Sequence, residues 1–124
     1  MVKLIIFGFL FILFFLFLSR IIMDEKENII EKFEDGSPKL IHITKFFMGK
    51  HHLIRSIEFW EKDKIRYDKE IKNGRPEGKQ IFISESDEKT EQWIKNGKRH
   101  GKYYQWNSKG ELILEEIWNL GEKK

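Results

Sequence analysis

The hydrophobic residues of this chain follow two different patterns. Residues 4–18 contain no polar side chain, whereas apolar and polar residues alternate in short segments after residue 38. Alternation with a period of two places successive side chains on opposite faces of a β-strand. The two patterns therefore predict one N-terminal helix followed by an all-β domain, an antiparallel meander of about seven or eight short strands.

The apolar N-terminal segment follows Lys3 and continues to Met23, interrupted only by Ser19 and Arg20. A helix of about 20 residues is about 30 Å long, which is enough to cross the hydrocarbon layer of a membrane. A basic residue before an apolar run is also typical of a secretory signal, but no small-residue cleavage site follows. Residues 1–23 are therefore predicted to be an uncleaved signal anchor, with a cleaved signal as the alternative. A buried core helix is disfavoured, because nothing else in the chain could cover so large an apolar surface.

A signal of this kind directs the rest of the chain across the membrane. The basic residues that flank the segment give modest support to a cytoplasmic N-terminus. We expect a single-pass membrane protein, anchored through residues 4–23, whose C-terminal domain is periplasmic or extracellular; secretion after cleavage is the alternative. The chain has no cysteine, so neither a disulfide nor a lipid anchor on cysteine is available.

The segment after the apolar run has a weak helical pattern. Ile29, Ile30 and Phe33 would share one face of a short helix from Asp24 to Phe33. Gly36-Ser37-Pro38 would end that helix. We therefore expect residues 24–38 to form a juxtamembrane stalk between the anchor and a β-domain at residues 39–124.

A repeated turn motif organises the β-domain. Residues 71–79 and 94–102 both read I-K-N-G-[RK]-x-x-G-K, and the Asn-Gly pairs predict type I′ hairpin turns because both central residues need positive φ. Weaker copies place glycines at Gly49 and Gly121, so that the repeat glycines are 49, 74, 97 and 121. A fixed period of this kind predicts a repeat array, although two coincident turns in an ordinary meander would give the same phrase. The structural turn residues are expected to be Asn73, Gly74, Gly78, Asn96, Gly97 and Gly101.

The repeated units resemble MORN repeats in their bacterial variant form. That pattern is a strand ending in an aromatic or apolar residue, then N-G-[KR], a glycine four residues on, and an aromatic strand. Residues 91–104 match it well, whereas residues 80–82 read Gln-Ile-Phe where tyrosines are usual. The first copy has Leu53 in place of its second glycine, and the last copy stops after the turn. The resemblance covers residues 39–124 and implies a hairpin-repeat scaffold; it implies no particular reaction.

Neither a catalytic nor a metal-binding pattern stands out. His51 and His52 are adjacent in a predicted strand and would point to opposite faces, while His42 and His100 lie far from them in the sequence. No Ser-His-Asp order or nucleophile elbow is visible, and the glycines punctuate hairpins instead of preceding a helix as in phosphate-binding loops. We therefore expect no enzymatic activity, no metal and no cofactor.

The charge balance argues against a nucleic-acid partner. The formal net charge is +3, but Lys3 and Arg20 belong to the apolar segment, which leaves 21 basic and 20 acidic residues in the rest of the chain. A nearly neutral domain has little general attraction for a polyanion. Basic residues at successive turns could contact phosphate or lipid head groups, although lysines in turns are usually only solvated.

Aromatic residues suggest an interaction surface. In one strand Tyr104 and Trp106 share a face, as Ile81 and Ile83 do in the neighbouring unit, so we expect this face to be packed. The opposite face would mix aromatic and amide groups without charge, as contact surfaces often do, although the aromatic residues could equally stack on one another along the sheet. The predicted partner-binding residues are Gln80, Phe82, Tyr103 and Gln105.

Together these features predict a membrane-anchored, non-enzymatic repeat module that binds another protein in a bacterium. The alternative is an exported or antitoxin-like protein that neutralises a partner toxin, because some proteins with the resembling repeats are labelled antitoxins and others are exported proteins of unknown role. A toxin gene beside this one would favour the alternative.

Overall fold

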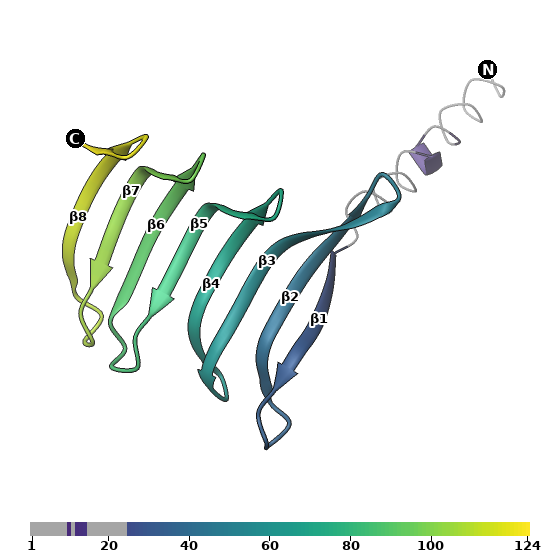
Figure 1. Ribbon diagram of the computed structural model, residues 1–124, viewed down its shortest axis with the longest axis horizontal. Coiled ribbons are helices and arrows are strands. Elements are labelled where there is room, and N and C mark those ends of the chain that lie inside the picture. The colour runs from purple at the N-terminus through teal and green to yellow at the C-terminus, as the bar shows by residue number, and fades with distance from the viewer. Residues whose placement is uncertain (1–9, 11, 15–24) are drawn as a thin grey trace.

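The computed structural model describes residues 10, 12–14 and 25–124 of the chain, and residues 25–124 form one antiparallel β-sheet (Figure 1). Nine strands lie in the sheet in the same order as in the sequence, which is the topology of a meander. The all-β antiparallel prediction is therefore confirmed. The strands are β1 (Glu25–Lys32), β2 (Pro38–Phe47), β3 (Lys50–Glu61), β4 (Lys64–Lys72), β5 (Arg75–Ile83), β6 (Lys89–Lys95), β7 (Lys98–Trp106), β8 (Leu112–Asn119) and β9 (Glu122–Lys123).

Most of the predicted N-terminal anchor lies outside the described residues. Only residues 10 and 12–14 of that segment are described, and they are helical. Within the described part of the chain, no helix combines the length and the apolar character that crossing a bilayer requires.

The segment after the anchor is a strand, so the predicted helix from Asp24 to Phe33 is wrong. Residues 25–32 pair with β2 in a register that runs from Glu25 opposite Lys45 to Lys32 opposite Pro38. In this pairing Ile29 lies opposite Ile41, the one apolar side chain that is buried among the described residues. Backbone pairing and this apolar contact outweigh a weak helical periodicity. The sheet consequently begins at Glu25, and it has one or two more strands than the sequence predicted.

Two-residue turns join the strands at one end of the sheet. Asn73-Gly74 and Asn96-Gly97 have positive φ at both residues, 52° and 74° in the first turn and 52° and 76° in the second. Positive φ at both central residues is what the predicted type I′ turns require. The weaker copies have the same geometry, with φ of 49° at Met48 and 77° at Gly49. The turn at residues 120–121 also has positive φ at both positions, so the hairpin repeat extends through all four predicted copies.

Longer loops join most of the strands at the opposite end. Three five-residue loops repeat one hydrogen-bonding pattern, in which the first residue's N–H donates to the last residue's carbonyl oxygen at 2.9 Å. In each loop the fourth residue's N–H also donates to the first carbonyl oxygen at 3.0 Å. The chain therefore alternates tight turns at one end with regular loops at the other. The three loops are residues 33–37, 84–88 and 107–111.

The second glycine of each well-matched repeat occupies an irregular position in the strand pairing. Gly78 has φ of 90° and lies where the register between β4 and β5 shifts. A side chain at Gly78 would collide with the Glu70 carboxylate, which accepts a hydrogen bond from the Lys79 backbone N–H at 2.7 Å. Gly101 has φ of 100° beside the corresponding shift between β6 and β7. These glycines let the strand bend around its neighbour without steric strain.

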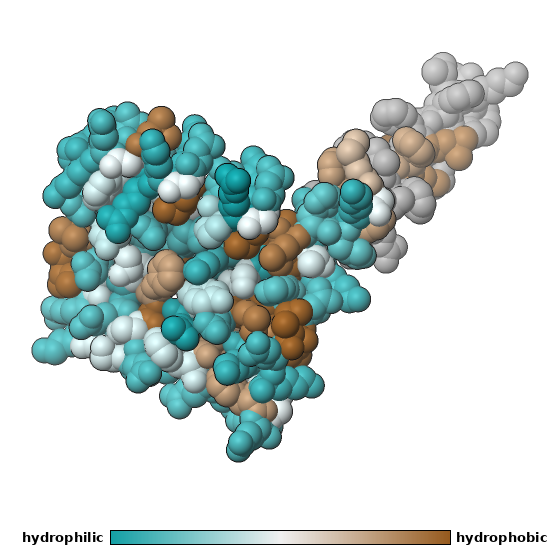
Figure 2. Space-filling model, in the orientation of Figure 1, coloured by the Kyte–Doolittle hydropathy of each residue, from teal (hydrophilic) through white to brown (hydrophobic). Residues whose placement is uncertain are grey.

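The centre of the sheet is polar. Only one layer of structure is present in residues 25–124, and apolar patches remain visible on a mostly hydrophilic surface (Figures 1 and 2). The buried side chains of the described residues are Ser56, Asp68, Gln80 and Glu91, besides one isoleucine. Pairs of side chains on neighbouring strands, and not a hydrophobic core between two layers, therefore stabilise this fold.

Candidate interaction surfaces of the sheet

The strand register assigns the predicted contact residues to one face of the sheet. Gln80 lies opposite Gln92, which lies opposite Tyr103, and two residues along the strands Phe82 lies opposite Thr90. Paired residues share a face, as do residues two apart in a strand. We call this surface face A; its predicted members are Gln80, Phe82, Tyr103 and Gln105. The opposite surface, face B, carries Ile81, Ile83, Tyr104 and Trp106.

One aromatic cluster on face A surrounds Lys69. The rings of Tyr67 and Phe82 are 6.4 Å apart, and Lys69 Nζ lies 4.2 Å from the first ring centroid and 5.3 Å from the second. Burial, together with the nearby Glu58 carboxylate, raises the pKa of the Tyr67 hydroxyl. Phe82 retains 37% of its surface exposed. The Lys69 ammonium group thus lies over two aromatic rings, as in a cation–π contact.

A second cluster on face A is built around Arg99. Its guanidinium carbon lies 4.8 Å from the Tyr103 ring centroid and 5.0 Å from that of Trp118. Arg99 Nε also donates a hydrogen bond to Gln92 Oε1 at 3.0 Å. A guanidinium stacked on aromatic rings is typical of protein interfaces. The pattern of aromatic residues in the sequence does not point to Arg99 or Lys69, although Arg99 is four residues before Tyr103 in the same strand and therefore on the same face.

Gln80 lies between the two clusters but is not an open contact group. Only 2% of its surface is exposed, and its Nε2 donates to the Glu70 carbonyl oxygen at 2.9 Å. Its Oε1 is buried and has no protein partner in the described structure. Gln80 thus serves as the floor of a shallow depression, whereas the sequence predicted a contact residue there. The depression is lined by Lys69, Arg75, Pro76, Gln80, Phe82, Gln92, Ile94 and Gly97.

Face B carries ion pairs and aromatic contacts. Arg55 binds the buried Asp68 carboxylate with two nitrogen atoms, and these hydrogen bonds raise the pKa of the guanidinium. Glu91 accepts from Lys79 Nζ at 3.1 Å and lies 3.7 Å from Lys89 Nζ. These two carboxylates are 23 residues apart and occupy equivalent positions in successive repeats. These paired carboxylates were not predicted as site residues, although the repeat period places them at equivalent positions.

The sequence predicted that face B would be packed and face A open, but the side chains of the two faces do not differ in burial in this way. Tyr104 contacts Trp93 at a centroid distance of 6.3 Å and Trp106 at 5.5 Å. All three side chains nevertheless remain half-buried, as does Tyr103 on face A. Because one layer of strands leaves both faces open, the structure does not separate a packed face from a contact face.

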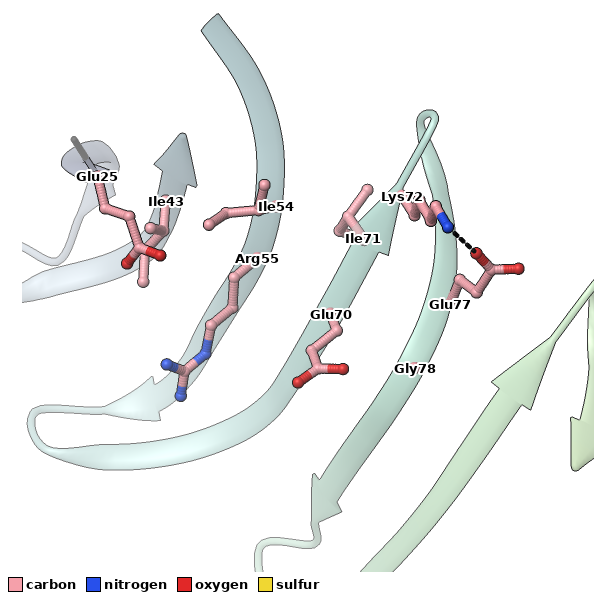
Figure 3. Close-up of a pocket in the computed structure, with 9 residues that line it drawn as sticks. All are labelled: Glu25, Ile43, Ile54, Arg55, Glu70, Ile71, Lys72, Glu77 and Gly78. Atoms are coloured by element: carbon pink, nitrogen blue, oxygen red, sulfur yellow. Dashed lines mark ion pairs between the residues drawn. The ribbon is translucent and has the colours of Figure 1, made fainter. Parts of the chain in front are cut away.

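A groove on face B lies close to the tight-turn end (Figure 3). The Glu25 and Glu70 carboxylates point toward the Arg55 side chain from different strands, and Lys72 Nζ lies 3.8 Å from Glu77 Oε2. The apolar part of the lining comes from isoleucines. Mixed charges of this kind could receive a polar peptide, but no set of three His, Asp or Glu side chains in the described residues is placed to hold a metal ion. The groove is lined by Glu25, Ile43, Ile54, Arg55, Glu70, Ile71, Lys72, Glu77 and Gly78.

The adjacent histidines contact aromatic side chains. His51 lies edge-on to Phe46 with ring centroids 5.1 Å apart, and His52 lies 6.5 Å from Phe47. His52 Nε2 is also 3.2 Å from the Phe47 carbonyl oxygen. Both histidines therefore belong to the hairpin that joins β2 and β3.

The edge formed by β8 differs from the other edge of the sheet. Ile113 and Ile117 are more than half exposed, and Leu112 is 49% exposed. Strand β9 covers only the end of this edge, through pairs of Trp118 with Lys123 and Asn119 with Glu122. Along the rest of β8 the backbone groups that point away from β7 have no strand beside them in the described structure.

Comparisons with known proteins assign no family to this chain. No protein-family model, no curated protein and no solved structure matched it.

Proposed function

We propose that this protein is a membrane-anchored, non-enzymatic repeat module that binds another protein through face A of its sheet. The observation that carries the proposal is the single layer of strands, which leaves the Tyr103 and Phe82 side chains partly exposed beside the cations Arg99 and Lys69. Exposed aromatic side chains and arginines supply most of the binding energy at protein interfaces. Two such clusters on one face could hold a partner at two points.

We further propose that the repeats are MORN-like. The support is the recurrence of one hairpin geometry at glycines 49, 74, 97 and 121, including the copies whose sequence is least similar to the pattern. Replacement of the expected tyrosines near residue 81 and of the second glycine at Leu53 makes this a divergent array.

The distribution of charge supports attachment to a membrane at the tight-turn end. The four tight turns, each counted with one residue on either side, carry five basic residues and one acidic residue. The connections at the opposite end of the strands carry three basic and eight acidic residues, counted over residues 33–37, 61–64, 84–88 and 107–111. The sheet begins at the basic end, because Glu25 pairs with Lys45 near the first tight turn. A basic end next to the apolar residues 4–23 would suit an anionic lipid surface.

The anchor is tested by membrane extraction of the full chain. If residues 4–23 stay attached, the protein keeps its full mass and remains in the membrane fraction at high salt and at alkaline pH. Recovery of a shortened, soluble form would show that the signal is cleaved.

Binding through face A is tested by photo-crosslinking in the native organism. A photoreactive residue in place of Phe82 should form a discrete adduct with one partner, and Tyr103→Ala should reduce the yield of that adduct. The matched control carries the photoreactive residue in place of Lys109, in a loop at the opposite end of the strands. Equal adducts from both positions would contradict the proposed contact face.

A further inference from the structure

The tight turn between β2 and β3 is more apolar than the later tight turns. It reads Phe47-Met48-Gly49, whereas the equivalent residues of the later turns are Lys-Asn-Gly twice and then Asn-Leu-Gly. Met48 is 85% exposed and Phe47 is 42% exposed, so both side chains face solvent on the described structure. Adjacent residues of a strand point to opposite faces, so Phe46 and Phe47 give this hairpin an aromatic ring on each face. We call residues 46–49 the apolar tip.

Folding does not account for the methionine in the apolar tip. Met48 has φ of 49°, a conformation that a long apolar side chain adopts less readily than asparagine does. The turns at residues 73–74 and 96–97 have the same conformation, and both begin with asparagine. An apolar residue that is strained in its own fold and exposed there points to a contact outside the fold.

The place where the chain enters the sheet identifies the surface that the apolar tip can meet. Glu25, the first residue of β1, lies opposite Lys45, which is three residues before Met48 (Figure 1). The apolar segment of the sequence ends at Met23, only two residues before Glu25. Two residues of chain reach at most about 7 Å, and three residues along a strand cover about 10 Å. The end of the proposed membrane segment is therefore held within about 20 Å of the apolar tip, at the tight-turn end of the sheet.

The charges around the apolar tip suit a lipid surface. Residues 36–57, which contain the turn and most of both strands, include four basic residues and no acidic residue. Two of the basic residues, Lys45 and Lys50, lie on either side of the tip. Lysine stems can lie along apolar surface while their ammonium groups stay in a polar layer. Apolar side chains flanked by basic ones bind anionic membranes through burial of apolar surface together with charge attraction.

We infer that the apolar tip, residues 46–49, inserts into the surface of the membrane that holds residues 4–23. This inference rests on the proposed membrane anchor and adds a second point of attachment. Phe47 and Met48 enter the boundary between lipid head groups and acyl chains, and the two flanking lysines remain among the head groups. Two points of attachment fix the orientation of β2 and β3 relative to the bilayer, which one point would not do.

The test uses the full chain in lipid nanodiscs of phosphatidylcholine and phosphatidylglycerol. Because the chain has no cysteine, Met48→Cys supplies a single site for a fluorescent label. Nitroxides on the lipid acyl chains should quench this label, and the bilayer should shield it from aqueous iodide. The matched control is Asn73→Cys, at the equivalent position of the next tight turn. Lys72 and Arg75 should keep that turn out of the acyl layer, so lipid quenching should be about fivefold stronger at residue 48.

A second variant shows whether the native side chains drive the insertion. Phe47→Ser in the chain labelled at residue 48 should reduce quenching by the lipid nitroxides, because it removes apolar surface that the bilayer would bury. An unchanged signal would mean that the label itself drives insertion, and would overturn the inference. Equal quenching at residues 48 and 73 would do the same, since general charge attraction would then hold the tight-turn end at the lipid.

Two further outcomes separate the apolar tip from the anchor. Shielding of residue 48 from iodide without quenching by lipid would show that protein, such as a second copy, covers the tip instead of the bilayer. If the label stays in water while the chain resists alkaline extraction, only the second attachment fails. Release of the chain by alkaline extraction would remove the anchor itself, and the inference with it.

Discussion

At the scale of single residues, the tight turns show how strictly backbone conformation selects side chains. Gly74 and Gly97 have φ of 74° and 76°, and a Cβ added at either position would meet no atom within 4 Å. Any cost of a side chain there must therefore come from the backbone and not from a clash. Gly74→Val and Gly97→Val should each lower the free energy of unfolding by about 1–2 kcal/mol, because β-branched residues resist positive φ. Urea denaturation of residues 25–124 measures this; no change in either variant would show that the turns can adopt another geometry.

Two other residues of the chain fit the backbone conformation of their turns poorly. Met48 and Leu120 have φ of 49° and 47° at the first position of their turns, where the better-matched copies have asparagine. Asparagine tolerates this conformation, whereas a long apolar side chain is strained in it. Met48→Asn should therefore raise the free energy of unfolding by about 0.5–1 kcal/mol, and the same should hold for Leu120→Asn. Thermal denaturation tests this expectation, with Met48→Ala as a control that removes the side chain without supplying an asparagine.

At the scale of elements, the loop between β1 and β2 has a pH-dependent contact. The Asp35 carboxylate accepts hydrogen bonds from the Ser37 hydroxyl and from its backbone N–H, and these bonds lower the pKa of Asp35. A pKa that is lower in the folded state favours folding above the unfolded-state value, and this contribution is lost as the pH falls through the folded value. Ser37→Ala should raise the pKa of Asp35 toward its ordinary value. An NMR titration of the Asp35 carboxyl carbon measures the shift, and an unchanged pKa would show that the hydroxyl does not bind it.

The elements also show where sequence reasoning succeeded and where it failed. Turn positions were predictable because Asn-Gly has one strong conformational preference, and the repeat period extended that prediction to Met48-Gly49. The strand β1 was not predictable, because residues 25–32 carry only a weak pattern and their structure depends on pairing with β2. The local conformational preference of two residues determines a turn, whereas pairing with a strand elsewhere in the chain determines the structure of residues 25–32.

At the scale of the whole molecule, the absence of a second layer in the described residues limits what the sequence could say about the candidate site. Alternation correctly grouped Phe82 with Gln105 and Tyr104 with Trp106, because the period of two fixes which residues share a face. It could not show that Gln80 would be buried, since that depends on the shift in register beside Gly78. The clusters around Lys69 and Arg99 likewise depend on which side chains meet across strands.

The open single layer also changes the expected roles of the two adjacent tyrosines. The sequence predicted that Tyr104 lies on a packed face and Tyr103 on a contact face, but both are half-buried and both contact tryptophan or arginine side chains. Tyr103→Ala and Tyr104→Ala should therefore lower the free energy of unfolding by similar amounts, about 1–2 kcal/mol each. Urea denaturation of residues 25–124 gives these values, and the crosslink at Phe82 gives the effect on binding. Only Tyr103→Ala should reduce the crosslink, because only Tyr103 lies on face A with Phe82. A loss of binding with Tyr104→Ala alone would place the partner on face B, where the paired carboxylates lie.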